Sequence, residues 1–276
     1  MAENIHRLAV LIDADNVPRN DMQYVLTEIS KLGTASIRRA YGDWSNPSLA
    51  RWKNILHTLA IQPMQQFAYT IGKNATDSLL IIDALDLLYT AKLDGFCIIS
   101  SDSDFTPLAT RLREAGVMVY GFGERKTPEP FRAACDMFKF IEVLRPESKS
   151  SDELAPTELP APLNVLSEEP ASMEQTSSPN ELPVEQVPVD PARLHTELEV
   201  QMRAAVTATM KESGWSPLGV VGAMLLKRNT SFDPRNYGYS RLGELVRSQE
   251  DYLEIKEVPA GDNSLNTHMH IRLKTA

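Results

Sequence analysis

The sequence is poor in cysteine and has no long apolar run. Cys97 and Cys135 are its two cysteines, and neither has the spacing of metal ligands. A framework of several disulfides is therefore excluded, and free thiols in a reducing compartment are expected. No apolar run approaches the roughly 20 residues that a membrane-spanning helix needs. The N-terminus lacks a signal-peptide layout, because the short apolar run after it ends at Asp13. We therefore expect a cytoplasmic protein without membrane association.

The sequence also lacks an excess of basic charge, since its net charge is −9. Residues 147–192 hold ten acidic residues and one lysine, whereas the rest of the chain has 27 acidic and 27 basic residues. The same stretch contains eight of the 18 prolines and neither glycine nor an aromatic residue. Such a composition cannot bury enough apolar surface to offset the entropy lost on ordering. We expect a disordered acidic linker at 147–192 between domains at 1–146 and 193–276.

The first domain alternates apolar runs with segments of helical periodicity. Strands are predicted at 8–12, 34–41, 60–68, 96–99 and 117–122. Helices are predicted at 19–32, 47–59, 77–92 and 105–115. Three of the apolar runs are continuous, which is typical of strands buried on both faces, whereas Pro63 favours an edge position for its strand. This alternation predicts a parallel α/β sheet with helices on both faces.

Acidic side chains stand at the ends of two of these strands and at the start of one helix. Asp13 ends the first strand, Asp102 and Asp104 follow the strand at 96–99, and Asp77 opens the long helix. In such sheets the ligand lies outside the carboxyl ends of the strands, so these acids should converge. Crowded carboxylates repel one another, and Mg²⁺ or Mn²⁺, which prefer oxygen ligands, removes that repulsion. The sequence therefore predicts a divalent metal site.

Each acid also has a structural explanation. Asp104 can cap the helix that follows it, and Asp77 can stabilise a helix N-terminus. Asp13 and Asp102 are harder to explain in this way, because each directly ends an apolar strand. Two further acids of the long helix are predicted to be structural, since at 100° per residue they point away from the first turn: Asp83 and Asp86.

Three segments in this order resemble the blocks of the NYN domain family, the LabA-like branch of the PIN-like nucleases. They read LAVLIDADNVP, GKNATDSLLIIDALDLL and IISSDSDFTPLATRLREAGVMVYGFG. The resemblance implies a PIN-like fold and an Mg²⁺- or Mn²⁺-dependent ribonuclease, and an endonuclease is expected. Metal ligation falls by position on Asp13, Asp77 and Asp102, with Asn16 and Asp104 completing the catalytic set. Lys73, in the second block, is a candidate RNA-binding residue.

Two alternatives to a nuclease stay open. The segment VLIDADNV also fits the first motif of haloacid-dehalogenase-type phosphatases, in which Asp13 would be the nucleophile and Asp15 the acid/base. That fold needs a serine or threonine strand end, then a lysine, then a separate acidic strand end. Here Ser100 and Ser101 share one strand end with the acidic pair. The second alternative is a non-catalytic RNA-binding or scaffolding protein that keeps the acids for folding.

The C-terminal domain has the pattern of a winged helix-turn-helix. Helices are predicted at 194–213, from 218 onward and at 239–247, and period-two strands at 252–258 and 267–273. The stretch FDPRNYGYSRLGELV after LGVVGAMLLKRN resembles the OST-HTH, or LOTUS, domain, which implies RNA binding or protein docking.

Five cations on or beside the second and third predicted helices of this domain are candidates for RNA binding. They are Lys227, Arg228, Arg235, Arg241 and Arg247. The domain has 11 basic and 10 acidic residues, however, so a solvated helical face is an equally good explanation. A protein partner for this domain stays possible, and the sequence does not determine the oligomeric state.

Overall fold

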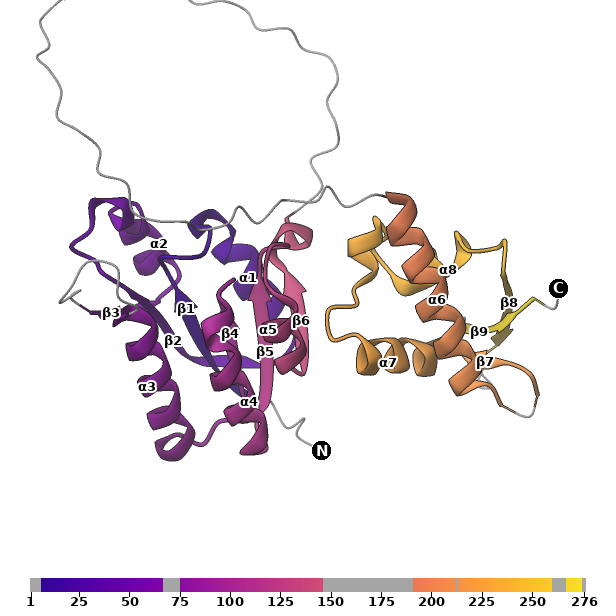
Figure 1. The fold of residues 1–276 in the computed structure, drawn as a ribbon, viewed down its shortest axis with the longest axis horizontal. Coiled ribbons are helices and arrows are strands. Elements are labelled where there is room, and N and C mark those ends of the chain that lie inside the picture. The colour runs from indigo at the N-terminus through magenta and orange to yellow at the C-terminus, as the bar shows by residue number, and fades with distance from the viewer. Residues whose placement is uncertain (1–5, 67–74, 146–190, 212, 260–266, 275–276) are drawn as a thin grey trace, which may run out of the picture.

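The computed structural model describes residues 6–66, 75–145, 191–211, 213–259 and 267–274. A layered α/β domain is followed by a smaller, largely helical domain (Figure 1). The predicted linker lies almost entirely outside the described residues. The last two residues of the predicted range, 191 and 192, belong to a helix, and the linker itself stays a prediction. Among the described residues, no helix combines the length and the apolar character needed to cross a membrane.

The first domain is built on a six-stranded sheet in which every neighbouring pair is parallel. The strands are β1 (Arg7–Asp13), β2 (Thr34–Gly42), β3 (Gln62–Gln65), β4 (Gly95–Ile99), β5 (Met118–Gly123) and β6 (Met137–Phe140), in the order β3-β2-β1-β4-β5-β6. The five predicted strands are confirmed, and β3, with Pro63, lies at an edge. The strand order reverses between β1 and β4, and a crevice forms at such a switch point.

Helices cover both faces of this sheet, as predicted. They are α1 (Met22–Ile29), α2 (Trp52–Thr58), α3 (Ala75–Thr90), α4 (Thr106–Glu114) and α5 (Glu129–Ala134), with single 3-10 turns η1 (Arg19–Asp21), η2 (Pro47–Leu49), η3 (Ser103–Phe105) and η4 (Ile141–Leu144). Side chains of β1 alternate between the two cores. Val10 packs with α1 and α2, whereas Leu11 packs with α3, α4 and α5. The strand is thus apolar throughout because both of its faces are buried.

The structure differs from the sequence prediction at three places in this domain. The helix predicted at 19–32 begins as the turn η1 and ends at Ile29. Neither α5 nor β6 was predicted, because six and four residues are too short to show a period. Their aromatic side chains nevertheless complete the core, since Phe131 and Phe138 are fully buried in edge-to-face contact.

The second domain is a winged helix, as predicted. It contains α6 (Pro191–Thr209), α7 (Leu218–Arg228), the turn η5 (Pro234–Tyr237), α8 (Leu242–Arg247), β7 (Ser216–Pro217), β8 (Leu253–Pro259) and β9 (Thr267–Leu273). The strands form an antiparallel sheet in the order β7-β9-β8. The third helix starts three residues later than predicted, because Arg241 before it has an extended backbone. Leu198, Val221, Leu245 and Ile271 join the helices and the sheet in one core.

Candidate metal centre

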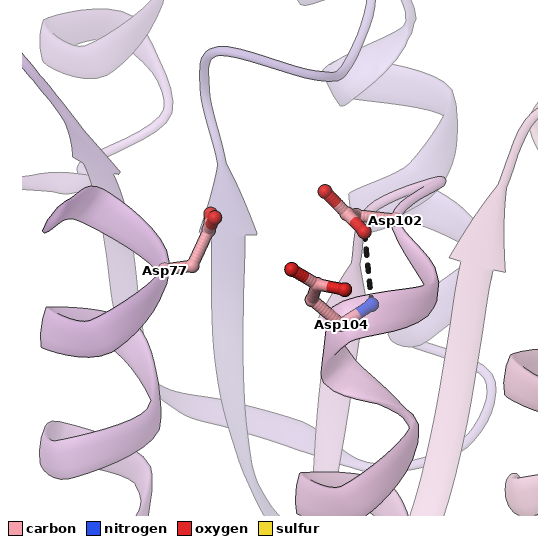
Figure 2. Close-up of side chains that lie close together, drawn as sticks. All are labelled: Asp77, Asp102 and Asp104. Atoms are coloured by element: carbon pink, nitrogen blue, oxygen red, sulfur yellow. Dashed lines mark hydrogen bonds between the residues drawn. The ribbon is translucent and has the colours of Figure 1, made fainter. Parts of the chain in front are cut away.

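Three carboxylates converge at the crevice between α3 and the end of β4. Each of Asp77, Asp102 and Asp104 offers a ligand oxygen, and these oxygens lie within 4.8 Å of one another. Figure 2 shows Asp77 on the first turn of α3, facing the two acids that follow β4. The side chains of Asp77 and Asp102 are half-buried, and that of Asp104 is exposed. Carboxylates from two separate elements thus share one small volume, which is the arrangement a hard divalent cation prefers.

The backbone after β4 fixes the spacing of the acidic pair. Asp102 has an extended conformation, and its Oδ1 accepts a hydrogen bond of 2.8 Å from the backbone N–H of Asp104. The cap of the turn η3 is therefore Asp102, whereas the structural explanation considered above placed a cap at Asp104. This single hydrogen bond holds both carboxylates on the same side of the turn (Figure 2).

Asp13 ends β1 next to this group and is fully buried. Its Oδ2 accepts hydrogen bonds from Ser100 Oγ at 2.7 Å and from Asn16 Nδ2 at 3.0 Å. Its Oδ1 is buried and has no hydrogen-bond partner among the described residues. Buried carboxylate oxygens normally have partners, so an orphaned one needs an explanation. A cation at the neighbouring acids would supply the missing positive charge, so the residues present fit a metal ion.

The electrostatics of the crevice also fit a cation. Burial, followed by the negative charges of Asp13, Asp102 and Asp104, raises the pKa of Asp77 to about 6. Burial likewise raises the pKa of Asp13, although the hydrogen bonds from Ser100 and Asn16 act in the opposite direction. Without a cation the site therefore disfavours full ionisation, and a bound divalent ion would reverse that preference.

Asp83 fixes the orientation of α3, and with it the position of Asp77. Its carboxylate accepts a hydrogen bond of 2.6 Å from Arg39 Nη1 and another from the hydroxyl group of Tyr41. Arg39 and Tyr41 both lie on β2, so the middle of α3 is tied to the sheet. This arrangement agrees with the predicted structural role of Asp83.

Ser100 is the residue of the centre that the sequence reasoning missed, since it considered this serine for the phosphatase alternative alone. Its buried hydroxyl group donates to Asp13 and accepts from the backbone N–H of Asp102 at 3.0 Å. One side chain thus connects the end of β1 with the start of the acidic turn. The signal in the sequence was a hydroxyl residue directly between an apolar strand and two aspartates.

The candidate RNA-binding cations have different surroundings. Lys73 lies outside the described residues. Lys227 and Arg228 are exposed in the last turn of α7, and Arg241 is exposed just before α8.

The remaining two candidates already have acidic partners. Arg247 is exposed but forms an ion pair of 2.7 Å with Glu257. Arg235 is half-buried and pairs with Asp233 at 2.7 Å and with Glu28 at 3.1 Å. RNA contact by these five cations stays a prediction, and for Arg235 the structure offers carboxylates as the alternative partner.

Two segments of the chain match models of known domain families. Residues 7–144 match the model of the NYN domain. The chain belongs to the NYN family. Residues 195–265 match the OST-HTH/LOTUS domain. The NYN domain has a nuclease-like fold, and OST-HTH/LOTUS domains are associated with RNA binding.

Solved structures of three bacterial proteins are similar to parts of this chain. A protein of unknown function from Vibrio parahaemolyticus is 21% identical with a TM-score of 0.43, covering 51% of this chain and 96% of its own. An uncharacterised protein from Nitrosomonas europaea is 29% identical with a TM-score of 0.26, covering 38% and 94%. A fragment of a Chromobacterium violaceum protein is 38% identical with a TM-score of 0.23, covering 28% and 78%. No curated protein matches the sequence.

Proposed function

We propose that this NYN protein is a metal-dependent ribonuclease, and an endonuclease in particular, whose OST-HTH/LOTUS domain recruits the RNA. The observation that carries the proposal is the convergence of Asp77, Asp102 and Asp104 within 4.8 Å at the switch point of an NYN sheet. An acidic cluster at this edge, in a family with a nuclease-like fold, is suited to phosphodiester hydrolysis.

The side chains of the centre divide into ligands and positioning residues. Asp77, Asp102 and Asp104 would hold Mg²⁺ or Mn²⁺, with Asp13 beside them offering its unpartnered oxygen. The bound ion would supply an activated water and offset negative charge on the scissile phosphate. Because ligands bind metal in the deprotonated form and the pKa of Asp77 is raised to about 6, metal binding should weaken as the pH falls through 6. Ser100 and Asn16 hold the carboxylate of Asp13 in one orientation.

The phosphatase alternative needs Asp13 as an accessible nucleophile. Asp13 is instead fully buried, and hydrogen bonds from Ser100 and Asn16 occupy its Oδ2. A nucleophilic carboxylate must reach the phosphorus atom in line with the leaving group, which this burial prevents. We therefore favour the nuclease, and keep the non-catalytic RNA-binding protein as the second candidate.

The proposal is tested by assaying the full chain on single-stranded RNA, first with a chelator and then with Mn²⁺ or Mg²⁺ restored. We expect cleavage of internal bonds that depends on added metal and is abolished in Asp102→Asn. The amide oxygen of asparagine can still accept the Asp104 N–H, so this variant should keep its thermal stability. Relief of carboxylate repulsion can even raise that stability in the absence of metal.

Asp86→Asn is the matched control, because Asp86 is an exposed aspartate of α3 outside the group of three. It should cleave as the wild type does. Unchanged metal-dependent cleavage by Asp102→Asn would contradict the assignment of the site. Absence of cleavage by the wild type with either ion, on RNA as well as on single-stranded DNA, would favour the non-catalytic candidate.

A further inference from the structure

The sheet of the NYN domain ends at β6, and the winged-helix domain lies beside this strand (Figure 1). An edge strand presents backbone groups that no neighbouring strand pairs, and natural proteins usually cover them. Here the backbone N–H of Phe138 donates to the carbonyl oxygen of Thr230 at 2.9 Å. The hydroxyl group of Thr230 in turn donates to the carbonyl oxygen of Arg132, also at 2.9 Å. One residue of the second domain thus satisfies two backbone groups of the first.

Charged side chains from both domains meet next to this contact. Glu28 and Lys139 belong to the first domain and pair at 2.5 Å, whereas Asp233 and Arg235 belong to the second and pair at 2.7 Å. Arg235 crosses to Glu28 at 3.1 Å, and Lys139 lies 4.0 Å from Asp233. Each domain therefore offers one acid and one base to the other, and opposite signs face each other across the contact.

This charge cluster is largely shielded from water. The exposed fraction of the side chain is 8% for Glu28, 11% for Asp233 and 17% for Lys139. Burial alone would raise the pKa of Glu28, but hydrogen bonds from Lys139, Lys31 and Arg235 bring it down to about 2. Charged groups that are shielded in this way are screened weakly by salt, and losing one partner leaves the others unmatched.

The contacting segment of the winged helix has a fixed shape of its own. Asp233 caps the turn η5, since its Oδ1 accepts from the backbone N–H of Arg235 at 2.9 Å. Asn229 Oδ1 accepts from the N–H of Ser231 at 3.0 Å, and Asn236 Nδ2 donates to the carbonyl oxygen of Ser231 at 2.9 Å. A preformed segment loses little entropy when it docks, which favours a specific contact over an occasional one.

We infer that the open edge of the NYN sheet is a docking surface for the winged-helix domain of the same chain, and that the two domains move as one body. The occupant is the segment 229–235, which supplies the backbone acceptor to β6 and the charges opposite Glu28 and Lys139. This inference does not depend on the nuclease proposal, because it concerns how the domains are held and not what they cleave.

Docking also has a consequence for the surface that the domains share. A cleft of about 750 Å³ lies beside the contact and is lined by residues of both domains. Arg113 and Arg132 line it from the first domain, and Lys227 and Arg228 from the second. The relative position of these cations is therefore set by the charge cluster, and a chain with independent domains would not present them together.

The test is a measurement of rotational tumbling by ¹⁵N relaxation on the full chain, together with its molar mass in solution. The wild type should be a monomer in which the amides of both domains report one common correlation time. Arg235→Glu places a third carboxylate beside Glu28 and Asp233, so the common correlation time should be lost and two shorter ones should appear. Glu28→Gln removes the acid of the other domain and keeps the size of the side chain. This variant should also move the two domains away from a common correlation time.

Arg247→Glu is the matched control, because it reverses an arginine of the same domain whose partner, Glu257, also lies in that domain. It should leave the common correlation time unchanged. Independent tumbling of the two domains in the wild type would overturn the inference, and so would a common correlation time that survives in both Arg235→Glu and Glu28→Gln. A wild-type dimer whose domains separate on dilution would show that docking occurs between chains, which would also overturn it.

Discussion

At the scale of single residues, the candidate centre depends on a buried carboxylate that does not belong to the group of three. Asp13 has one oxygen held by Ser100 and Asn16 and one without a partner. Groups that hydrogen-bond to a metal-site carboxylate, and so fix its orientation, typically contribute 10- to 100-fold to metal affinity or activity. Ser100 positions both acids. Its hydroxyl group donates to Asp13 and also accepts a hydrogen bond from the backbone N–H of Asp102.

We predict that Ser100→Ala lowers metal affinity and cleavage by roughly 10- to 100-fold, because Asp13 loses a hydrogen bond and the turn after β4 loses its acceptor. Titration of Mn²⁺ by calorimetry and the cleavage rate at saturating metal measure the two effects. Ser101→Ala is the control, since that hydroxyl group accepts from Glu124 and not from the centre. Equal effects of the two substitutions would argue against a positioning role for Ser100.

The raised pKa of Asp77 leads to a prediction on pH. Its folded pKa of about 6 lies above the ordinary value of 3.8. The stabilising contribution of protonated Asp77 is therefore complete below pH 4 and is lost as the pH rises through 6. Asp77→Asn mimics the protonated form, so in a chelator its stability relative to the wild type should increase by about 1–3 kcal/mol between pH 4.5 and 7.5. Denaturant unfolding at several pH values measures this difference, and a difference independent of pH would contradict it.

At the scale of elements, the long helix α3 carries one half of the centre and must be held against the sheet. Leu80, Ala84 and Leu87 provide the apolar contact, and Asp83 adds a directional one to Arg39 and Tyr41. Apolar packing by itself permits small rotations of a helix, whereas a charged hydrogen bond to two side chains of β2 resists them. Asp83 thus contributes to the centre from six residues away.

We predict that Asp83→Asn destabilises the protein by about 1–3 kcal/mol, because the partly buried Arg39 loses its counter-charge. Cleavage per folded molecule should fall as well, since Asp77 is no longer held at its distance from Asp102. Chemical unfolding measures the loss of stability. A cleavage assay under conditions far below the unfolding transition, where the variant is folded, measures the loss of cleavage. Asp86→Asn, on an exposed position of the same helix, should change neither, and equal behaviour of the two variants would refute the anchoring role.

At the scale of the whole molecule, the proposed function assigns the chemistry to the NYN domain and the recruitment of RNA to the winged helix. The acids that form the centre all belong to the NYN domain, whereas Lys227 and Arg228 are exposed on α7 of the winged helix. Neither of these two cations forms an ion pair within the described part of the chain, so both can meet phosphate. In the proposed function, the winged helix would act by raising the local concentration of RNA at the NYN domain.

We predict that Lys227→Glu with Arg228→Glu raises KM for single-stranded RNA severalfold and leaves kcat largely unchanged. Few phosphates are contacted in a domain of near-zero net charge, so the dependence of binding on salt should be shallow in the wild type and shallower still in the variant. Lys92→Glu is the control, because Lys92 follows the end of α3 that lies away from Asp77. An unchanged KM would indicate that the module docks a protein and not RNA.

The sequence by itself determined the sheet, the faces of its helices and the edge at which the acids gather. Continuous apolar runs and helical periods carry this information locally, and parallel strands place their carboxyl ends on the same side. The placement of the acids after β1 and β4 at one edge of the sheet could therefore be predicted from the sequence. The same logic failed for α5 and β6, whose six and four residues are too few for a period.

The tertiary structure alone decided which atoms meet. It placed Asp104, and not Asp13, in the group of three, made Asp102 the cap of the turn, and connected Asp13 to Asp102 through Ser100. It also placed Arg235 against Glu28, more than 200 residues away in the chain. Local patterns specify which face of an element is buried, but a hydrogen bond between distant residues depends on the packing of both elements at once, and no local pattern encodes that.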